Sequence, residues 1–146
     1  MDGFSRTIAV FREMAIIQER MDAILKVRLP ADLPPTQFKL LNHLIFTTNA
    51  NETASEIARN FHVSLSAMSQ VISQLTKKGF VELQIRRQDA RKKTIVITEQ
   101  GRSAHQQASA LIDIGIKSFS KKFKLNDMQQ LYELSHQFRL CFEEHT

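Results

Sequence analysis

The hydrophobic pattern of this chain changes from helical to alternating at one position, Gly79, and this change constrains the fold more than any other feature. Before it, apolar residues recur at the spacing of one helix face: Met68, Val71, Ile72 and Leu75. After it, apolar residues alternate with polar ones, as in a strand: Val81, Leu83 and Ile85. Since glycine adopts the left-handed conformation that ends many helices, Gly79 is the expected helix stop. A helix followed at once by a strand is therefore predicted here.

The segments on either side of this helix and strand extend the pattern. Upstream, Thr53 and Glu56 have the spacing of a capping box, and Ser64 can cap the helix of residues 64–78. Two capped helices joined by a three-residue turn have the layout of a helix-turn-helix. Downstream, residues 94–97 alternate again, which predicts a hairpin over 81–97 with its tip at 87–93. A hairpin directly after a helix-turn-helix is a wing, so we expect a winged helix-turn-helix lobe over 34–98.

Positive charge is concentrated in this same region. The chain carries 20 Lys and Arg against 15 Asp and Glu, a formal net charge of +5. Residues 77–93 contain seven cations and two anions, whereas the remaining 129 residues carry 13 of each sign. Clustered cations favour phosphates, because binding releases condensed counterions. The pattern predicts a polyanion-binding surface, with a solvated charged loop as the alternative.

The exposed face of the 64–78 helix is suited to nucleic acid. Its residues are small or hydrogen-bonding and include no carboxylate, so they can approach phosphates and base edges without charge repulsion. We expect this helix in the major groove and the hairpin 81–97 in the minor groove. The predicted DNA-binding residues are Ser64, Ser66, Ser69, Gln70, Ser73, Gln74, Lys77, Arg86, Arg87, Arg91, Lys92 and Lys93.

Long helices are expected on both sides of this lobe. Gly and Pro number only seven of 146 residues, about 5% against roughly 12% on average, which leaves little room for a many-stranded fold. Apolar periodicity predicts helices over 4–27, 35–47 and 99–120, the last capped by Thr98. A final helix is expected to open at the Asn126 to Gln129 capping box and to bury Met128, Leu131, Leu134, Phe138 and Cys141. We therefore predict a mainly α protein in which 1–30 and 99–146 form a helical dimerisation region, because paired half-site readers need one.

Other chemistry has weaker support. The four glycines are too far apart for a nucleotide-binding loop, and no nucleophile, base or paired-carboxylate motif indicates an enzyme. The five histidines lack metal-ligand spacing, so no metal or cofactor is predicted, although a site between His43 and His105 stays open. Cys141 is expected to be a buried, unreactive thiol rather than a redox sensor. Without an apolar span or signal pattern, a soluble, cytoplasmic protein is expected.

Several motifs resemble those of the MarR family of winged-helix regulators. They are Gly79-Phe80-Val81, then Asp89-Ala90-Arg91, and Ile97-Thr98 leading to Gly101. Residues 33–38 and 53–58 are also similar to the starts of that family's second and third helices. One departure is Leu83, where family members often carry Arg.

The resemblance implies roles for individual residues. Arg91 would enter the minor groove, and Asp89 would orient it through an ion pair; Arg86 or Arg87 could be its partner in place of the arginine missing at Leu83. The resemblance further implies a homodimeric repressor on a pseudo-palindromic DNA site, released by a small, often aromatic, effector. Side chains of the first two predicted helices could line an effector pocket, namely Phe11, Met14, His43 and Phe46, with ordinary core packing as the alternative. The alternatives are a winged-helix scaffold that docks an acidic protein, and a metal or redox sensor.

Overall fold

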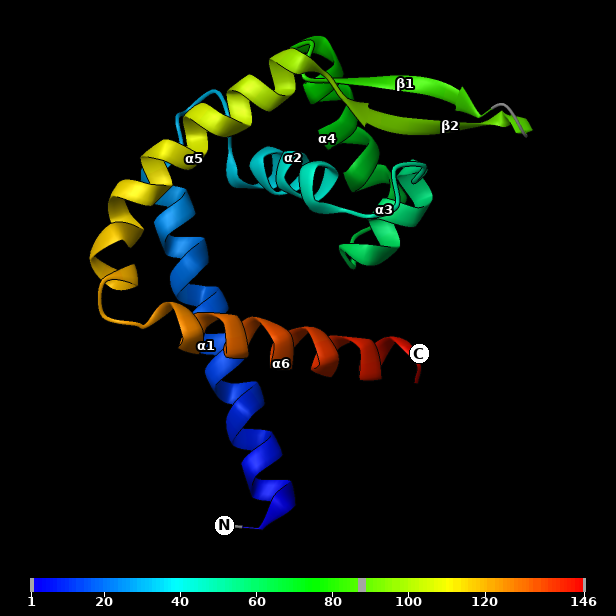
Figure 1. Ribbon diagram of the computed structural model, residues 1–146. Coiled ribbons are helices and arrows are strands. Elements are labelled where there is room, and N and C mark those ends of the chain that lie inside the picture. Colours follow the sequence, from blue (N-terminus) through cyan, green and yellow to red (C-terminus); the bar gives the residue numbers. More distant parts are fainter. Residues whose placement is uncertain (1, 87–88, 146) are drawn as a thin grey trace. The chain divides into compact units, whose positions relative to one another are not determined.

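The computed structural model describes residues 2–86 and 89–145, with the side chains of residues 86, 115, 118 and 119 left out. Within these ranges the chain forms six helices and one antiparallel hairpin (Figure 1). This confirms the predicted mainly α fold with a β-hairpin. The elements are α1 (Gly3–Arg28), α2 (Pro35–Phe46), α3 (Ala54–Asn60), α4 (Leu65–Lys77), β1 (Val81–Arg86), β2 (Asp89–Ile97), α5 (Glu99–Ser120) and α6 (Leu125–Glu143).

The chain divides into two compact units, Met1–Ile112 and Asp113–Thr146. The core of the first unit joins α2, α3, α4 and both strands, and its largest fully buried side chains are Leu40, Leu41, Ile57, Leu75, Val81 and Ile95. On α2 the structure buries Leu40 completely, whereas Leu44 and Ile45, which the periodicity places in the core, are only half-buried. The helices α2, α3 and α4 and the base of the hairpin therefore share one hydrophobic core.

The predicted helix boundaries in this unit are set by local hydrogen bonds. Thr53 and Glu56 form both halves of a capping box at the start of α3. Ser64 accepts from the amide of Ala67 at 3.1 Å and so caps α4. Gly79 has a φ of 76°, the left-handed conformation that glycine adopts without steric cost. These three signals explain why the helix-turn-helix was predictable from sequence.

The hairpin differs from the prediction in the length of its second strand. β2 begins at Asp89 rather than at residue 94, because strand pairing continues outward through Ile85 and Lys93 to Arg86 and Asp89, with a register shift between Ile85 and Arg86. The predicted tip of 87–93 is therefore wrong, and Lys92 and Lys93 belong to a strand. The far end of the hairpin extends beyond α2, α3 and α4 (Figure 1).

Helices α1 and α6 keep their apolar residues at the surface of the protomer. On α1 these include Phe4, Ile8, Val10, Phe11, Met14 and Ile17, and on α6 Leu125, Met128, Leu131, Tyr132, Leu134, Leu140 and Phe142. No side chain of α6, all of which are described, is buried. The predicted burial of Met128, Leu131, Leu134 and Cys141 is thus wrong for one protomer, since all four are exposed, and Phe138 is half-buried. A single helix cannot cover its own apolar stripe, so a second surface is needed to bury it.

The start of α6 differs from the predicted capping box. α6 begins one residue before Asn126, with Lys124 at the cap position and no capping side-chain hydrogen bond, so the predicted Asn126 capping box is wrong. None of the described helices is long and apolar enough to cross a membrane.

Candidate nucleic-acid interface

The recognition helix predicted over 64–78 is α4, and its two faces have different chemistry. Met68, Ile72 and Leu75 are buried against the lobe. This orientation leaves the polar residues of the opposite face exposed: Ser66, Ser69, Gln70, Ser73 and Lys77. Ser64 is also exposed, but its oxygen is engaged as the helix cap. The exposed face presents hydroxyl, amide and ammonium groups, which are the groups that hydrogen-bond to bases and phosphates.

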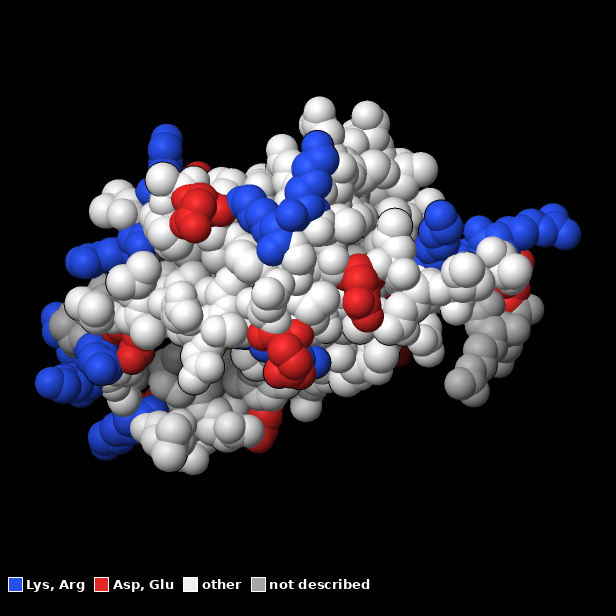
Figure 2. Space-filling model, turned by 90° about the horizontal axis from the view of Figure 1, so that it is seen from above, with Lys and Arg blue, Asp and Glu red and all other residues white. Residues whose placement is uncertain are grey.

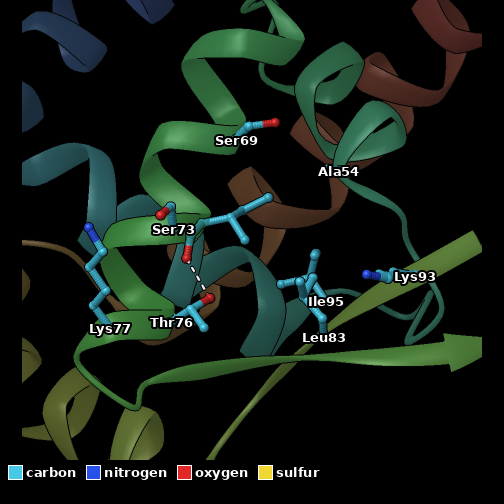
Figure 3. A pocket seen from close by; sticks show the side chains of 9 residues that line it. Ala54, Ser69, Ser73, Thr76, Lys77, Leu83, Lys93 and Ile95 are labelled. Atoms are coloured by element: carbon cyan, nitrogen blue, oxygen red, sulfur yellow. Dashed lines mark hydrogen bonds between the residues drawn. The ribbon is translucent and has the colours of Figure 1, made fainter.

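A groove of about 420 Å³ separates α4 from the hairpin (Figure 3). Four residues of α4's outer side, Ser69, Ser73, Thr76 and Lys77, line it together with Ile72, Ala54 and, from the hairpin, Leu83, Lys93 and Ile95. Thr76 donates its hydroxyl hydrogen bond to the Ile72 carbonyl at 2.7 Å, so this hydroxyl is satisfied within the helix. The residues that line the groove include two lysines and no carboxylate. The groove therefore connects the predicted helix and hairpin sites through a mostly apolar floor with a lysine from each element, Lys77 and Lys93.

Basic side chains continue along the hairpin. Arg91, Lys92 and Lys93 are exposed, and Lys and Arg side chains gather at its projecting end (Figure 2). Arg87 lies outside the described residues, as does the side chain of Arg86. Cations clustered at the end of a projecting hairpin are accessible to the phosphate backbone of a nucleic acid.

Asp89 is placed to organise the start of β2. Its Oδ1 accepts a hydrogen bond from the backbone amide of Arg91 at 3.0 Å. This contact orients the backbone of Arg91, and the ion pair with its guanidinium group that the resemblance implies stays a prediction. Asp89 thereby acts on the position of Arg91 at the level of the main chain.

Gln74 and Lys78 make side-chain contacts with Gln37 of α2. The side-chain amide of Gln37, which is buried, donates to Gln74 Oε1 at 3.0 Å and accepts from Lys78 Nζ at 2.6 Å. Lys78 also donates to the carbonyl of Asp32. Gln74, predicted as a DNA-binding residue, and Lys78 are both exposed, so these contacts orient their side chains without burying them, and the DNA-binding role of Gln74 stays a prediction. The partners are 37 and 41 residues apart, so sequence spacing gave no sign of these contacts.

Sequence reasoning missed a buried carboxylate, Glu52, beside this lobe's hairpin. Its side chain accepts from His43 Nε2 at 2.7 Å, from Thr47 Oγ1 at 3.1 Å and from Asn60 Nδ2 at 2.7 Å. The residue is only 3% exposed, and its backbone carbonyl accepts from the amide of Ile95 at 3.1 Å. The only available signal was an acidic residue next to the Thr53 cap, which by itself does not indicate burial.

The predicted effector residues lie on two helices. α1 provides Phe11 and Met14, which are partly exposed, and α2 provides Phe46, which is 72% exposed. His43 is engaged by Glu52 and lies edge-on to Phe61, with ring centroids 5.3 Å apart. The groove described above is lined by none of these four residues.

His105 of α5 is held by α2. It stacks on Phe38, with ring centroids 5.1 Å apart, and its Nε2 lies 2.9 Å from Asn42 Oδ1. Burial lowers the pKa of the His105 imidazole. Since an amide oxygen only accepts hydrogen bonds, Nε2 carries the hydrogen in this contact. His43 and His105 thus have separate partners, and among the described residues no group of three His, Cys, Asp or Glu side chains could hold a metal ion.

Comparison with known proteins identifies the fold and the family. The profile of the MarR family matches residues 31–92. An HTH-type transcriptional regulator from Bacillus cereus (strain ATCC 10987 / NRS 248) is 31% identical over 104 residues, which cover 70% of this chain and 67% of that protein. Further HTH-type regulators from Bacillus species match over 77 residues, 49% of their length.

Solved structures share the fold along most of the chain. A mutant MarR from E. coli complexed with operator DNA has a TM-score of 0.66 and 24% identity, covering 94% of this chain and 99% of its own. CouR from Rhodococcus jostii RHA1 bound to p-coumaroyl-CoA has a TM-score of 0.70 and 16% identity, covering 88% and 90%. The matched proteins are regulators and not enzymes, in agreement with the sequence prediction. The chain belongs to the MarR family of winged-helix, DNA-binding transcriptional regulators.

Proposed function

We propose that this protein is a homodimeric, sequence-specific repressor, with α4 in the major groove of DNA and the hairpin in the adjacent minor groove. The observation that carries this proposal is the groove between α4 and the hairpin. Ser69, Ser73 and Lys77 from the helix line it together with Lys93 from β2. A continuous surface with a lysine on each side and no carboxylate in its lining thus spans the two elements that would enter neighbouring grooves of a duplex.

Roles within this surface follow from its chemistry. Ser66, Ser69, Gln70 and Ser73 would contact base edges, because hydroxyl and amide groups can read donor and acceptor patterns. The exposed cations Lys77, Arg91, Lys92 and Lys93 would contact phosphates or the minor groove, where they set affinity more than sequence preference. Arg86 and Arg87 would extend this cationic arm. Gln74, which is also exposed, would be oriented for DNA contact by Gln37, which donates to its amide oxygen.

Dimerisation is supported by the apolar faces of α1 and α6. Both helices carry large exposed hydrophobic residues along most of their length. A second copy of the chain would cover them, which is why we assign residues 1–30 and 99–146 to dimerisation and 34–98 to DNA binding. Two-fold symmetry then requires a pseudo-palindromic site with half-sites centred about 10 bp apart.

Release of DNA would be driven by a small aromatic effector. The support is the partly exposed apolar side chains Phe11, Met14 and Phe46 and the neighbouring His43, together with a structural neighbour that is bound to p-coumaroyl-CoA. An effector that prefers a dimer geometry with displaced recognition helices lowers DNA affinity by the ratio of its affinities for the two geometries. A panel of aromatic acids and their thioesters, added to the protein–DNA complex, tests this step.

Selection from randomised duplex DNA at about 150 mM salt tests the DNA-binding proposal, because this salt concentration suppresses non-specific attraction. We expect an inverted repeat from the unmodified protein and much weaker recovery with Arg91→Ala. Gln70→Ala should recover a shifted base preference at its contact position. A pool without sequence preference would overturn the proposal and favour a general polyanion binder or an acidic protein partner.

A further inference from the structure

Glu52 connects the hairpin to the helix-turn-helix through two different parts of the same residue. Its side chain is bound to α2 and α3: His43 lies on α2, Thr47 follows it, and Asn60 ends α3. Its backbone is bound to β2, because its carbonyl accepts from Ile95 N–H at 3.1 Å. The next residue, Thr53, forms an isolated antiparallel bridge with Thr94.

The carboxylate is well satisfied in this position. Oε1 accepts from His43 and Thr47, and Oε2 accepts from Asn60, so both oxygens have donors. A buried carboxylate without donors would strongly destabilise the fold. With three donors, it fixes the position of its own residue relative to the α2 and α3 side chains that bind it. An apolar side chain of similar size would fill the space without fixing this position.

The position of the Glu52 contact on β2 is important, because a small rotation of the hairpin at this point displaces its far end by a larger distance. Ile95 and Thr94 are 2% and 4% exposed and mark where β2 leaves the lobe, whereas Lys93 and Arg91 follow outward along the strand. A strand rises about 3.3 Å per residue, so Arg91 lies about 13 Å from Ile95 along the chain. A tilt of about 10° at Ile95 would therefore move Arg91 by about 2 Å, enough to break a hydrogen bond to DNA.

We propose that Glu52 is a positioning residue for DNA binding, which fixes the angle between the hairpin and the recognition helix α4. This inference rests on the proposed function, since it assumes that the hairpin contacts DNA. It assigns a share of the operator affinity that the wing provides to a buried residue, which is 3% exposed.

Whether Glu52→Gln weakens or strengthens operator binding distinguishes a positioning role from the effect of net charge alone. Glu52→Gln preserves the shape of the side chain but places an amide NH₂ against donors that need an acceptor. The substitution also raises the formal net charge by one from +5, which alone would strengthen binding to DNA. We expect the opposite, about a tenfold weaker Kd for the selected operator. Glu99→Gln, at an exposed position on α5, is the matched control for the charge change and should bind as tightly as the unmodified protein or slightly more tightly.

A double-mutant cycle on the full-length protein tests whether the effect acts through the wing. Operator affinity is measured for Glu52→Gln in the unmodified, Arg91→Ala and Gln70→Ala backgrounds, after urea unfolding has shown that each variant is folded at the assay temperature. The tenfold loss should shrink to less than twofold with Arg91→Ala and persist with Gln70→Ala. Asn60→Ala, which removes one donor and leaves the carboxylate, is the second variant if Glu52→Gln does not fold. It should show the same pattern with a smaller loss.

The outcomes distinguish this inference from the function on which it rests. If Arg91→Ala weakens binding but the Glu52→Gln loss is equal in all three backgrounds, Glu52 affects the lobe as a whole and the inference is wrong while the proposed function stands. If Arg91→Ala has no effect on affinity, the wing does not contact DNA and both are wrong. Hydroxyl-radical footprinting gives an independent readout, because Glu52→Gln should remove the flanking minor-groove protection and retain the protection around α4.

Discussion

The hydroxyl of Thr98 donates a hydrogen bond to the carbonyl of Gly79 at 2.6 Å, which joins the residue directly after the hairpin to the glycine two residues before it. The same oxygen accepts from the amide of Gly101 at 3.0 Å and so caps α5. Thr98 N–H also donates to the Phe80 carbonyl at 3.0 Å. One residue thereby fixes both the base of the hairpin and the start of α5.

Gly101→Ala should destabilise the protein, because at Gly101 the helix α5 passes too close to Phe80 and Ile97 to leave room for a Cβ atom. A Cβ at Gly101 would lie 2.1 Å from the Phe80 backbone oxygen and 2.8 Å from Ile97 Cγ1. Backbone would have to move, at a cost of about 1–3 kcal/mol in the free energy of unfolding measured with urea. Gly3→Ala is the matched control, because a Cβ there meets no atom within 4 Å. Equal stability of the two variants would contradict the close approach.

His105 should make the protein less stable in mild acid. Burial lowers its folded-state pKa below the ordinary value of 6.5, so below about pH 6.5 the unfolded chain binds a proton that the folded protein does not. The contribution of neutral His105 to the free energy of unfolding is therefore fully present above pH 6.5. It is lost as the pH decreases toward the folded pKa, by at most about 1.4 kcal/mol per pH unit. Urea unfolding between pH 5 and 8 measures this slope.

The matched variants for this prediction are His105→Gln and His136→Gln. Glutamine at residue 105 keeps a donor for Asn42 but cannot titrate, so the acid-dependent loss should become smaller. His136 is exposed on α6, and its replacement should leave the slope as it is. An unchanged slope in His105→Gln would show that another group causes the loss.

Leu134→Lys should dissociate the proposed dimer. Leu134 is 65% exposed on α6, and a charge in a covered apolar interface would carry a large desolvation cost. Analytical ultracentrifugation should give the 16.8 kDa protomer for this variant and about twice that mass for the unmodified protein. Gln130→Lys, also exposed on α6, should remain dimeric. Dimers with Leu134→Lys would place the interface elsewhere.

Lys93→Ala should reduce the salt dependence of operator binding. Lys93 lines the groove beside α4, where a DNA phosphate could contact it. Each lost phosphate contact lowers the slope of log K against log salt by about 0.9, so a dimer should lose about 1.8. Lys121→Ala, which removes an exposed lysine after α5, controls for the change in net charge. The slope should decrease only in the first variant; an equal decrease in both would indicate a diffuse electrostatic effect.

Local signals made much of the fold predictable. The caps at Thr53, Ser64 and Thr98 and the left-handed Gly79 determine where helices begin and end within a few residues of chain. Residues 99–120 were predicted as a helix with the bounds that α5 has. The second strand was predicted too short, because cationic residues near its start mask the alternation that marks a strand.

Contacts between distant segments were not predictable. The Gln37 amide donates a hydrogen bond to Gln74 across 37 residues, and the burial of Glu52 depends on α2, α3 and β2 meeting at one point. The apolar stripe of α6 was recognised correctly as a pattern, but the sequence of one chain does not show whether its own lobe or a second copy covers Leu134. Periodicity identifies a face, and packing decides what that face contacts.

The ratio of two DNA affinities shows whether the protein reads DNA sequence. Binding of the full-length protein is measured at about 150 mM salt to the selected inverted repeat and to a duplex of the same composition in scrambled order. A sequence-specific regulator should prefer the repeat by about a thousandfold or more. Equal affinities for the two duplexes would contradict the assignment of α4 and the hairpin as a sequence-reading surface.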